Sequence, residues 1–329
     1  MNHPIRWGIL GTGIIARQFA DALRHVPDAQ LQAIASRQHA TALAFGRDFA
    51  GPTCYGSYAA LVSDPDVDVI YIATPHPLHA ENMRLCLQAG KPVLCEKPFT
   101  MHAGQACNVV ALAREKGLFL MEAMWSRFLP GIVEAKRLVD SGLIGPAQHV
   151  QADFGYYAEV GPEHRLLDPA LGGGALLDLG IYPLSMAAYF LGPVATTHAI
   201  AELGATGVDE HTAFTLRHAG GGLSSCFCSF RVTTPRELVI SGPLGSVRVA
   251  KPFSEARHIT IALRDAEVRT LTMPLIGNGY AHEAIEVGRC LRAGLRESPV
   301  MPLDQTVALL DNLDQMRGQI GLRYPADDE

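Results

Sequence analysis

Two short stretches of the chain carry side chains whose types and spacing suit proton chemistry. In "LCEKPF" an apolar run ends in Glu96 and Lys97, and Pro98 follows directly. In "GGGALLDLGIYPL" Asp178 and Tyr182 stand four residues apart, so they share one face if the segment is helical. The alternatives are an ordinary surface ion pair for Glu96 and Lys97, a capping role for Asp178 and a core position for Tyr182.

The second stretch also contains a proline that affects its expected helical backbone. Pro183 follows Tyr182 directly, and a proline disfavours α-helical geometry at the residue before it. We therefore expect a kink or a fresh helix start close to Tyr182.

The elements that would position the first stretch alternate between strand and helix. Residues Ile5 to Leu10 predict a buried strand, and "GTGIIA" follows it and opens a helix. This fits the dinucleotide pattern G-x-G-x-x-[G/A], in which Gly11 permits the tight turn, Gly13 lets a pyrophosphate approach and Ala16 lets the helix pack closely. The backbone at the helix start, Ile14 and Ile15, would then face the pyrophosphate, because unpaired N–H groups and the helix dipole attract anions there.

The second predicted strand, Leu31 to Ser36, decides which dinucleotide is expected. The acidic residue that would bind the ribose 2′-hydroxyl of NAD is missing, and Ser36 and Arg37 occupy its place. A hydroxyl and a guanidinium suit a 2′-phosphate. The sequence therefore favours NADP over NAD, with a solvated surface arginine as the alternative.

Further candidate cofactor contacts follow the remaining strands, because loops at the carboxyl ends of parallel strands line the ligand crevice. The strand in "VDVIYIATP" is apolar on both faces, and those in "KPVLCEKPF" and "LFLMEAMW" follow it. The residues expected at their ends are Thr74, Pro75, His76, His79, Glu96, Lys97, Trp125 and Arg127. His76 and His79 are equally suited to capping the next helix, and Trp125 to packing between domains.

From about residue 124 the pattern changes to short alternating segments with turns between them, which predicts a largely antiparallel sheet. The fold class is therefore α/β: a Rossmann domain at residues 1–123, and an α+β domain with a large, mostly antiparallel open sheet at residues 124–329. Candidate walls of a substrate pocket are the aromatic residues Trp125, Phe154, Tyr156 and Tyr280.

Composition narrows the classes of function. The 329 residues carry a formal net charge of −6 with no basic tract, which argues against nucleic acid as a partner. The chain shows no signal-peptide pattern and no credible membrane span, and its seven scattered cysteines favour reduced thiols in a cytoplasmic setting. Cys226 and Cys228 lack a second pair at zinc spacing, so no metal site is expected.

Taken together, these motifs resemble the GFO/IDH/MocA oxidoreductases, most closely their dihydrodiol dehydrogenase and NADP-dependent D-xylose dehydrogenase branch. The motifs are "GILGTGIIA", "AIASR", "YIATPHPLHAENM", "GKPVLCEKP", "FLMEAMWSRF", "GGGALLDLGIYPL" and "ESPVMPL". The resemblance implies Tyr182 as general acid/base, Lys97 as the residue that charges the site and Asp178 as its support. Many family members carry histidine where this chain has Tyr182. It also implies a homodimer or higher oligomer formed through the open sheet.

The implied reaction is hydride transfer between NADP and a hydroxyl or carbonyl of a sugar, polyol or trans-dihydrodiol. Two alternatives stay open from the residues alone. One is an anhydrosugar or inositol-type reductase, because hydroxyl-rich substrates require similar donors. The other is a non-catalytic protein of the same fold that senses NADP or a sugar, for which loss of Lys97, Asp178 or Tyr182 would be expected.

Overall fold

The structure is a computed structural model that describes residues 3–328. The chain forms two compact units. The first runs up to Trp125 and also takes in Ile276–Val307, and the second comprises Ser126–Leu275 and the segment from Ala308 onward.

The unit boundaries differ from the division expected at residues 123 and 124, because the segment Ile276–Val307 returns to the first unit. In that unit the N–H of Leu120 donates to the carbonyl of Arg296 at 3.0 Å. The hydroxyl of Thr306 donates to Glu122. Nothing in the local sequence pattern indicates such long-range contacts.

The first unit is built on a six-stranded parallel sheet in the order β3-β2-β1-β4-β5-β6, the order of dinucleotide-binding folds. The central strands are buried on both faces, which agrees with their apolar sequences. Their bounds are β1 Ile5–Leu10, β2 Ala29–Ala35, β3 Thr53–Tyr55, β4 Val69–Ile72, β5 Val93–Glu96 and β6 Leu120–Ala123.

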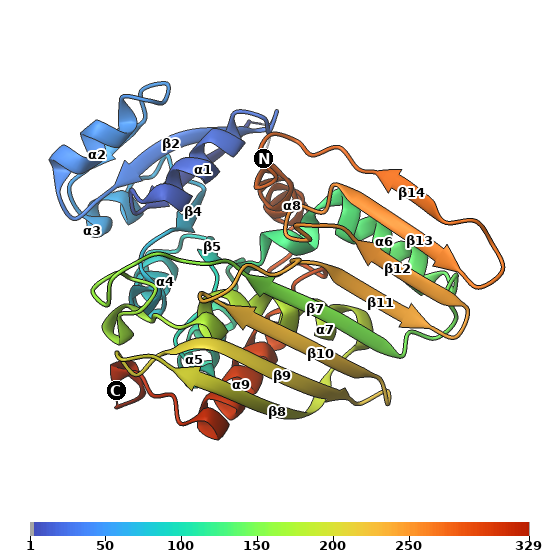
Figure 1. Ribbon diagram of the computed structural model, residues 1–329. Helices are drawn as coiled ribbons and strands as arrows, with labels where there is room; N and C mark the ends of the chain where they lie inside the picture. Colours follow the sequence, from blue (N-terminus) through green and yellow to red (C-terminus); the bar gives the residue numbers. More distant parts are fainter. Residues whose placement is uncertain (1–2, 329) are drawn as a thin grey trace. The chain divides into compact units, whose positions relative to one another are not determined.

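Helices connect these strands, as the expected alternation requires (Figure 1). They are α1 Ile14–Leu23, α2 His39–Gly46, α3 Tyr58–Val62, the 3₁₀ turn η1 His76–Leu78, α4 His79–Gln88 and α5 Ala103–Lys116. From the returning segment, α8 (Ala281–Arg292) packs on α1. Helix α9 (Leu303–Ile320) crosses the boundary between the units.

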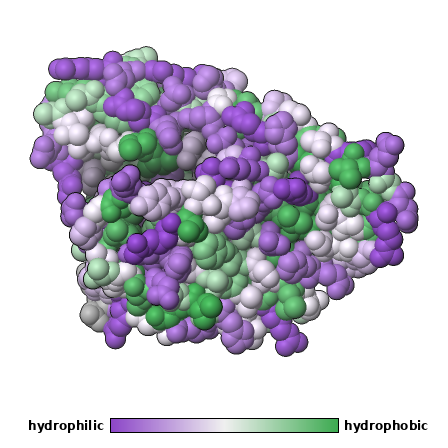
Figure 2. Space-filling model, viewed as in Figure 1, coloured by the Kyte–Doolittle hydropathy of each residue, from purple (hydrophilic) through white to green (hydrophobic). Residues whose placement is uncertain are grey.

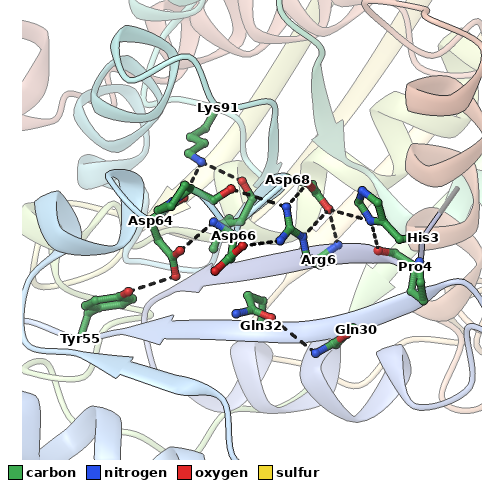
Figure 3. Close-up of polar contacts among 12 residues, drawn as sticks. His3, Pro4, Arg6, Gln30, Gln32, Tyr55, Asp64, Asp66, Asp68 and Lys91 are labelled. Carbon is green, nitrogen blue, oxygen red and sulfur yellow. Dashed lines mark hydrogen bonds and ion pairs between the residues drawn. The ribbon is translucent and has the colours of Figure 1, made fainter. Parts of the chain in front are cut away.

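The amino ends of β1 and β4 carry a dense set of charge pairs (Figure 3). Arg6 donates from Nε to Asp68 at 3.2 Å and from Nη1 to Asp66 at 2.6 Å. Lys91 Nζ donates to the carbonyls of Asp64 and Val67, at 2.6 and 2.8 Å. These bonds fix the loop that leads into β4.

The second unit is built on an eight-stranded sheet in the order β14-β13-β12-β11-β7-β10-β9-β8. Of its pairings, β7 with β10 is parallel and the others are antiparallel. Its strands are β7 His149–Gly155, β8 Val194–Leu203, β9 Asp209–His218, β10 Leu223–Ser229, β11 Leu238–Gly242, β12 Gly245–Val249, β13 His258–Leu263 and β14 Arg269–Thr272. The mixed α/β architecture expected from the sequence is confirmed.

Strand β8, which forms one edge of this sheet, was not expected from the sequence. The strand is mostly exposed or half-buried, so it lacks a clear apolar alternation. The side chain of Gln319 binds its outer edge: it accepts from the N–H of Ala199 and donates to the carbonyl of Thr197, at 2.8 and 2.9 Å. Side-chain amides of this kind occupy backbone groups that another strand would otherwise pair with.

Helices cover one face of this sheet. Helix α6 (Pro130–Asp140) packs on β12 and β13, and α7 (Ile181–Leu191) packs on β7 and β10. Cys226 and Cys228 point toward this covered face and are buried. The opposite face is turned to the viewer in Figure 1, and Figure 2 shows apolar and near-neutral residues among polar ones there.

Within residues 3–328, one stretch, Pro169–Leu191, is long and apolar enough to cross a membrane by length and composition alone. Inside the protein 89% of its apolar window is buried, and buried core helices pass the same test. The stretch therefore gives only weak evidence for a membrane span. It comprises the 3₁₀ turn η3 (Pro169–Leu171), the π-helical turn η4 (Leu176–Gly180) and α7.

Candidate functional site

The turn between β1 and α1 has the shape that a pyrophosphate requires. Gly11 adopts φ +101°, and a Cβ there would meet the carbonyl oxygen of Ala73 at 2.6 Å, so only glycine fits. A Cβ on Gly13 would meet nothing within 4 Å, which leaves its backbone open to a ligand. Ala16 is fully buried and Ile14 is largely exposed. The turn therefore fits a dinucleotide phosphate at the α1 N-terminus.

Ser36 and Arg37 directly follow the end of β2, next to this turn in the sheet order. The N–H of Ser36 donates to the carbonyl of Tyr55 at 3.2 Å, which ties the loop to β3. The side chain of Arg37 is exposed. Its charge opposes the rise that burial causes in the pKa of Tyr58, so the guanidinium lies near that phenol.

His79 links the ends of two neighbouring strands. The ring is fully buried, with Nε2 at 2.8 Å from the carbonyl of Thr74 and Nδ1 at 2.9 Å from the carbonyl of Pro98. Burial lowers the pKa of His79, and both carbonyl contacts oppose that shift. Asn82 donates to the Thr74 hydroxyl at 3.0 Å. His79 therefore fixes the loops that carry Thr74 and Lys97, while the ring of His76 lies 5.8 Å from it.

The end of β5 holds an acidic side chain inside the protein. Glu96 is buried and accepts a hydrogen bond from the hydroxyl of Tyr71. Lys97 follows it, half-buried, and the Lys97–Pro98 peptide bond is cis. From α8, Glu283 is also fully buried, and neither of its carboxylate oxygens has a hydrogen-bond partner among residues 3–328. Burial, and then the charge of Glu96, raises the pKa of Glu283 well above its usual range.

Trp125 and Tyr280 lie together in the first unit. Their rings stack with centroids 4.4 Å apart and planes 20° from parallel. Tyr280 precedes α8, so the returning segment supplies one half of the pair. Such a stack is a rigid aromatic wall, the type of surface that sugar and nicotinamide rings pack against. Both residues were expected to line the substrate pocket, and their stacking is compatible with that.

In the second unit, a change of helix type separates Asp178 from Tyr182. Asp178 lies in the π-helical turn η4, and Tyr182 lies at the start of α7. The expected fresh helix start near Pro183 is therefore present. Asp178 is buried, and the guanidinium of Arg165 lies 3.8 Å from its carboxylate. π-helical turns are frequent at functional positions.

The ring of Tyr182 is held by aromatic packing. Its centroid lies 5.0 Å from that of Phe154, which in turn lies 6.0 Å from Phe253. Tyr156 packs edge-on against Phe230 at 5.6 Å. Phe154 and Tyr156 thus line the same end of the sheet from β7 and from the loop after it.

Arg127, which follows the end of β6, is held inside the second unit. It is fully buried, and its guanidinium donates to the hydroxyl and the carbonyl of Ser185, at 2.8 and 2.9 Å. It also lies 5.0 Å from the ring centre of Tyr189. These contacts give Arg127 a packing role in the second unit, and its contact with the cofactor stays a prediction.

Three charged residues near these positions were missed by sequence reasoning: Arg165, Asp209 and Glu283. No motif marks them, because each reaches its neighbours through tertiary folding. A charged residue inside an apolar helix or strand start, as at Glu283 and Asp209, is the signal that would have selected two of them.

Comparison with known proteins agrees with this geometry. Residues 5–124 match the family model described as "Oxidoreductase family, NAD-binding Rossmann fold". Residues 132–248 match the model of the GFO/IDH/MocA C-terminal domain. The chain is 36% identical to mouse trans-1,2-dihydrobenzene-1,2-diol dehydrogenase over 98% of its own length and 99% of the relative's. The human enzyme of the same name is 35% identical over 98% and 99%.

Two solved structures of similar proteins bind nucleotides or polyols. A 3-ketoreductase from Actinomadura kijaniata, in complex with NADP and TDP-benzene, is 28% identical with a TM-score of 0.85 over 97% of this chain and 98% of that one. An aldose-aldose oxidoreductase from Caulobacter crescentus, complexed with glycerol, is 25% identical with a TM-score of 0.88 over 96% and 97%. The enzymatic reading is thereby favoured over the sensor. The chain belongs to the GFO/IDH/MocA family and is an oxidoreductase with an NAD-binding Rossmann domain.

Proposed function

We propose that this protein is an NADP-dependent dehydrogenase that transfers a hydride between the nicotinamide and a carbon bearing a hydroxyl group in a sugar, polyol or trans-dihydrodiol. The observation that carries the proposal is the turn at Gly11 and Gly13, with its open backbone at the start of α1. The names of the relatives, a dihydrodiol dehydrogenase and an aldose-aldose oxidoreductase, support the substrate class.

The preference for NADP rests on Ser36 and Arg37. The exposed guanidinium after β2 suits charge-assisted bonds to a 2′-phosphate, and no carboxylate stands at that strand end to repel it. The NADP bound to the similar 3-ketoreductase supports the same choice. When bound, NADP supplies the hydride acceptor of the reaction.

The chain's own residues then move the proton. Tyr182 takes the proton of the substrate hydroxyl in the oxidative direction and returns it in the reductive direction. The ammonium of Lys97 hydrogen-bonds the reacting oxygen and stabilises the negative charge that develops there. Asp178 is the supporting residue of this group, and the guanidinium of Arg165, in the preceding loop, lies 3.8 Å from its carboxylate. The stacked rings of Trp125 and Tyr280 form one wall of the substrate pocket.

Turnover with purified protein tests the proposal. The protein is incubated with NADP or NAD and a panel of pentoses, hexoses, inositols, anhydrosugars and trans-dihydrodiols, and nicotinamide absorbance is followed in both directions. We expect a rate above background with NADP and at least one hydroxylated substrate. Tight NADP binding with no rate for any compound would instead favour a sensor, and a rate confined to inositols or anhydrosugars would favour the alternative substrate class.

We further propose that two copies associate through the uncovered face of the eight-stranded sheet, and that the protein works in the cytoplasm. The face carries Ile200, Ala213, Phe227 and Val239, which the strand register places on one side of the sheet, and Ile200 is 76% exposed. Light scattering after size exclusion tests this: the natural chain is expected as a dimer or larger, and Ile200→Glu as a smaller species. A natural monomer would contradict it.

The seven free cysteines fit a reducing compartment, which supports the proposed cytoplasmic location.

A further inference from the structure

A buried aspartate, Asp209, anchors the helix that carries Asp178 and Tyr182. It is the first residue of β9, and its Oδ2 accepts from the backbone N–H of Leu176 at 2.7 Å and from the hydroxyl of Thr212 at 2.6 Å. Leu176 opens the π-helical turn η4. Asp209 is therefore a long-range cap on the first turn of this helix, supplied by a neighbouring strand.

The other carboxylate oxygen of Asp209 is in an unusual position. Asp209 is 0% exposed, and its Oδ1 has no hydrogen-bond partner within residues 3–328. A Cβ on Gly174 would lie 2.5 Å from this oxygen and 2.9 Å from the hydroxyl of Tyr324. That hydroxyl donates to the carbonyl of Gly173 at 2.6 Å. Asp209 and Tyr324 thus pack against the glycine turn before the helix, and only a glycine at position 174 leaves room for both side chains.

Keeping a charge at this position is costly for the fold. Burial raises the pKa of Asp209 to about 6, although the bonds from Thr212 and Leu176 and the neighbouring His211 oppose the rise. The other titratable groups around it are Tyr324 and Cys228, whose pKa values burial and then the charge of Asp209 raise. An asparagine would make the same bonds at neutral pH without the cost of burying a charge. The presence of an aspartate at position 209 in place of an asparagine therefore suggests a functional role for the charge.

We propose that Asp209 is a positioning residue for the dehydrogenase reaction, whose ionised carboxylate sets the orientation and the electrostatic field of the helix carrying Asp178 and Tyr182. The inference rests on the proposed function above and adds a residue to it. Asp209 acts through the backbone of that helix, and through the charge it places at the helix N-terminus.

The test compares Asp209→Asn with Asp168→Asn. Asp168 is a matched control, because it lies in the same unit and its carboxylate also accepts from a backbone N–H, that of Ala170 at 2.8 Å. In the wild type, the raised pKa makes folding stability fall as pH rises from about 4, the ordinary value for an aspartate, through the folded value near 6. Asp209→Asn lacks this loss, so its melting temperature at pH 8 is expected above that of the wild type.

The positioning role is decided by activity measured on the same samples. We expect Asp209→Asn to lower kcat about tenfold with little change in KM while melting higher at pH 8, whereas Asp168→Asn changes neither. A merely structural Asp209 predicts that stability and activity move together. An unchanged kcat in a well-folded Asp209→Asn, or an equal loss in Asp168→Asn, would overturn the proposal.

Thr212→Val covers the case in which Asp209→Asn fails to fold. Losing one hydrogen bond to the carboxylate raises the folded pKa of Asp209, so we expect the pH-dependent fall in melting temperature to begin at the same pH, near 4, and to extend about one pH unit higher. We also expect the pH profile of kcat to move with it. A shift in melting temperature without a shift in kcat would overturn the positioning role.

A readout without substrate separates this proposal from the proposed function. Amide hydrogen exchange in the peptide covering residues 174–182, corrected for the intrinsic effect of pH, is expected to speed up between pH 5 and 7.5 in the wild type and to stay constant in Asp209→Asn. If no substrate is turned over but this difference is present, the dehydrogenase assignment fails and the clamp on the helix stands. Equal exchange in both proteins would overturn the clamp itself.

Discussion

In the six-stranded sheet, charged side chains at the amino ends of the strands are paired differently from those at the carboxyl ends. These two ends are called here the amino edge and the carboxyl edge. At the amino edge, Arg6 meets Asp66 and Asp68, and Lys91 meets two carbonyl oxygens (Figure 3). At the carboxyl edge, Glu96 is buried beside the hydroxyl of Tyr71.

Glu283, inside the same unit, has no partner for either carboxylate oxygen in the described chain. Charges that serve only the fold are paired, because an unpaired buried charge is destabilising. We therefore expect buried polar groups retained at such a cost to lie near the proposed site of chemistry.

Removing one lysine from each end of the sheet tests whether only the carboxyl end takes part in catalysis. We expect Lys97→Met to lower kcat about a thousandfold, because the ammonium stabilises the developing charge on the reacting oxygen. Lys91→Met is the matched control. It should lower the free energy of unfolding by about 1 to 2 kcal/mol, through its lost bonds to Asp64 and Val67, and leave kcat unchanged. Equal effects of the two variants on kcat would remove the distinction between the edges.

The choice of dinucleotide gives the next largest effect. Arg37→Ala is expected to weaken NADP binding by about ten- to a hundredfold and to leave NAD binding nearly unchanged, because only NADP carries the 2′-phosphate. Titration calorimetry with both dinucleotides measures this. Arg47→Ala, another exposed arginine nearby in the chain, should alter neither affinity. An equal loss for NADP and NAD would show that Arg37 does not contact the 2′-phosphate.

Glu283 provides a test at alkaline pH. Its raised pKa means that its contribution to stability is complete below about pH 4, the ordinary value of a glutamate, and is lost as pH rises through the folded value. We therefore expect Glu283→Gln to melt at a higher temperature than the wild type at alkaline pH and close to it at acid pH. Melting curves across the pH range measure this, and parallel curves would show that Glu283 has an ordinary environment.

At the amino edge the pH dependence has the opposite sign and a smaller size. Burial acts to raise the pKa of Asp68, but the hydrogen bonds from Arg6 outweigh it and lower the pKa. Its stabilising effect is therefore present above about pH 4 and is lost as pH falls through the folded value. Asp68→Asn should cost about 1 kcal/mol at neutral pH, flatten the acid limb of the melting profile and leave kcat unchanged. A fall in kcat would link this edge to function.

Most of the fold could be predicted from local patterns. The G-x-G-x-x-A turn, the apolar parallel strands and the kink announced by Pro183 each depend on a few neighbouring residues, and each appears as expected. The return of Ile276–Val307 to the first unit and the edge strand β8 could not be predicted, because long-range contacts determine one and the other has weak alternation.

The candidate site divides in the same way. Lys97, Asp178 and Tyr182 stand in recognisable motifs, whereas Asp209, Arg165 and Glu283 become visible only through their tertiary neighbours.

Isotope transfer shows directly whether the protein moves a hydride from the substrate carbon to the nicotinamide. The protein is incubated with NADP and a turned-over substrate that carries deuterium on the carbon bearing the hydroxyl, and the nicotinamide is examined by mass spectrometry. We expect one deuterium in the reduced nicotinamide for the wild type, and a transfer rate about a thousandfold lower in Lys97→Met and Tyr182→Phe. Deuterium that appears in water instead, or equal transfer by all three proteins, would contradict it.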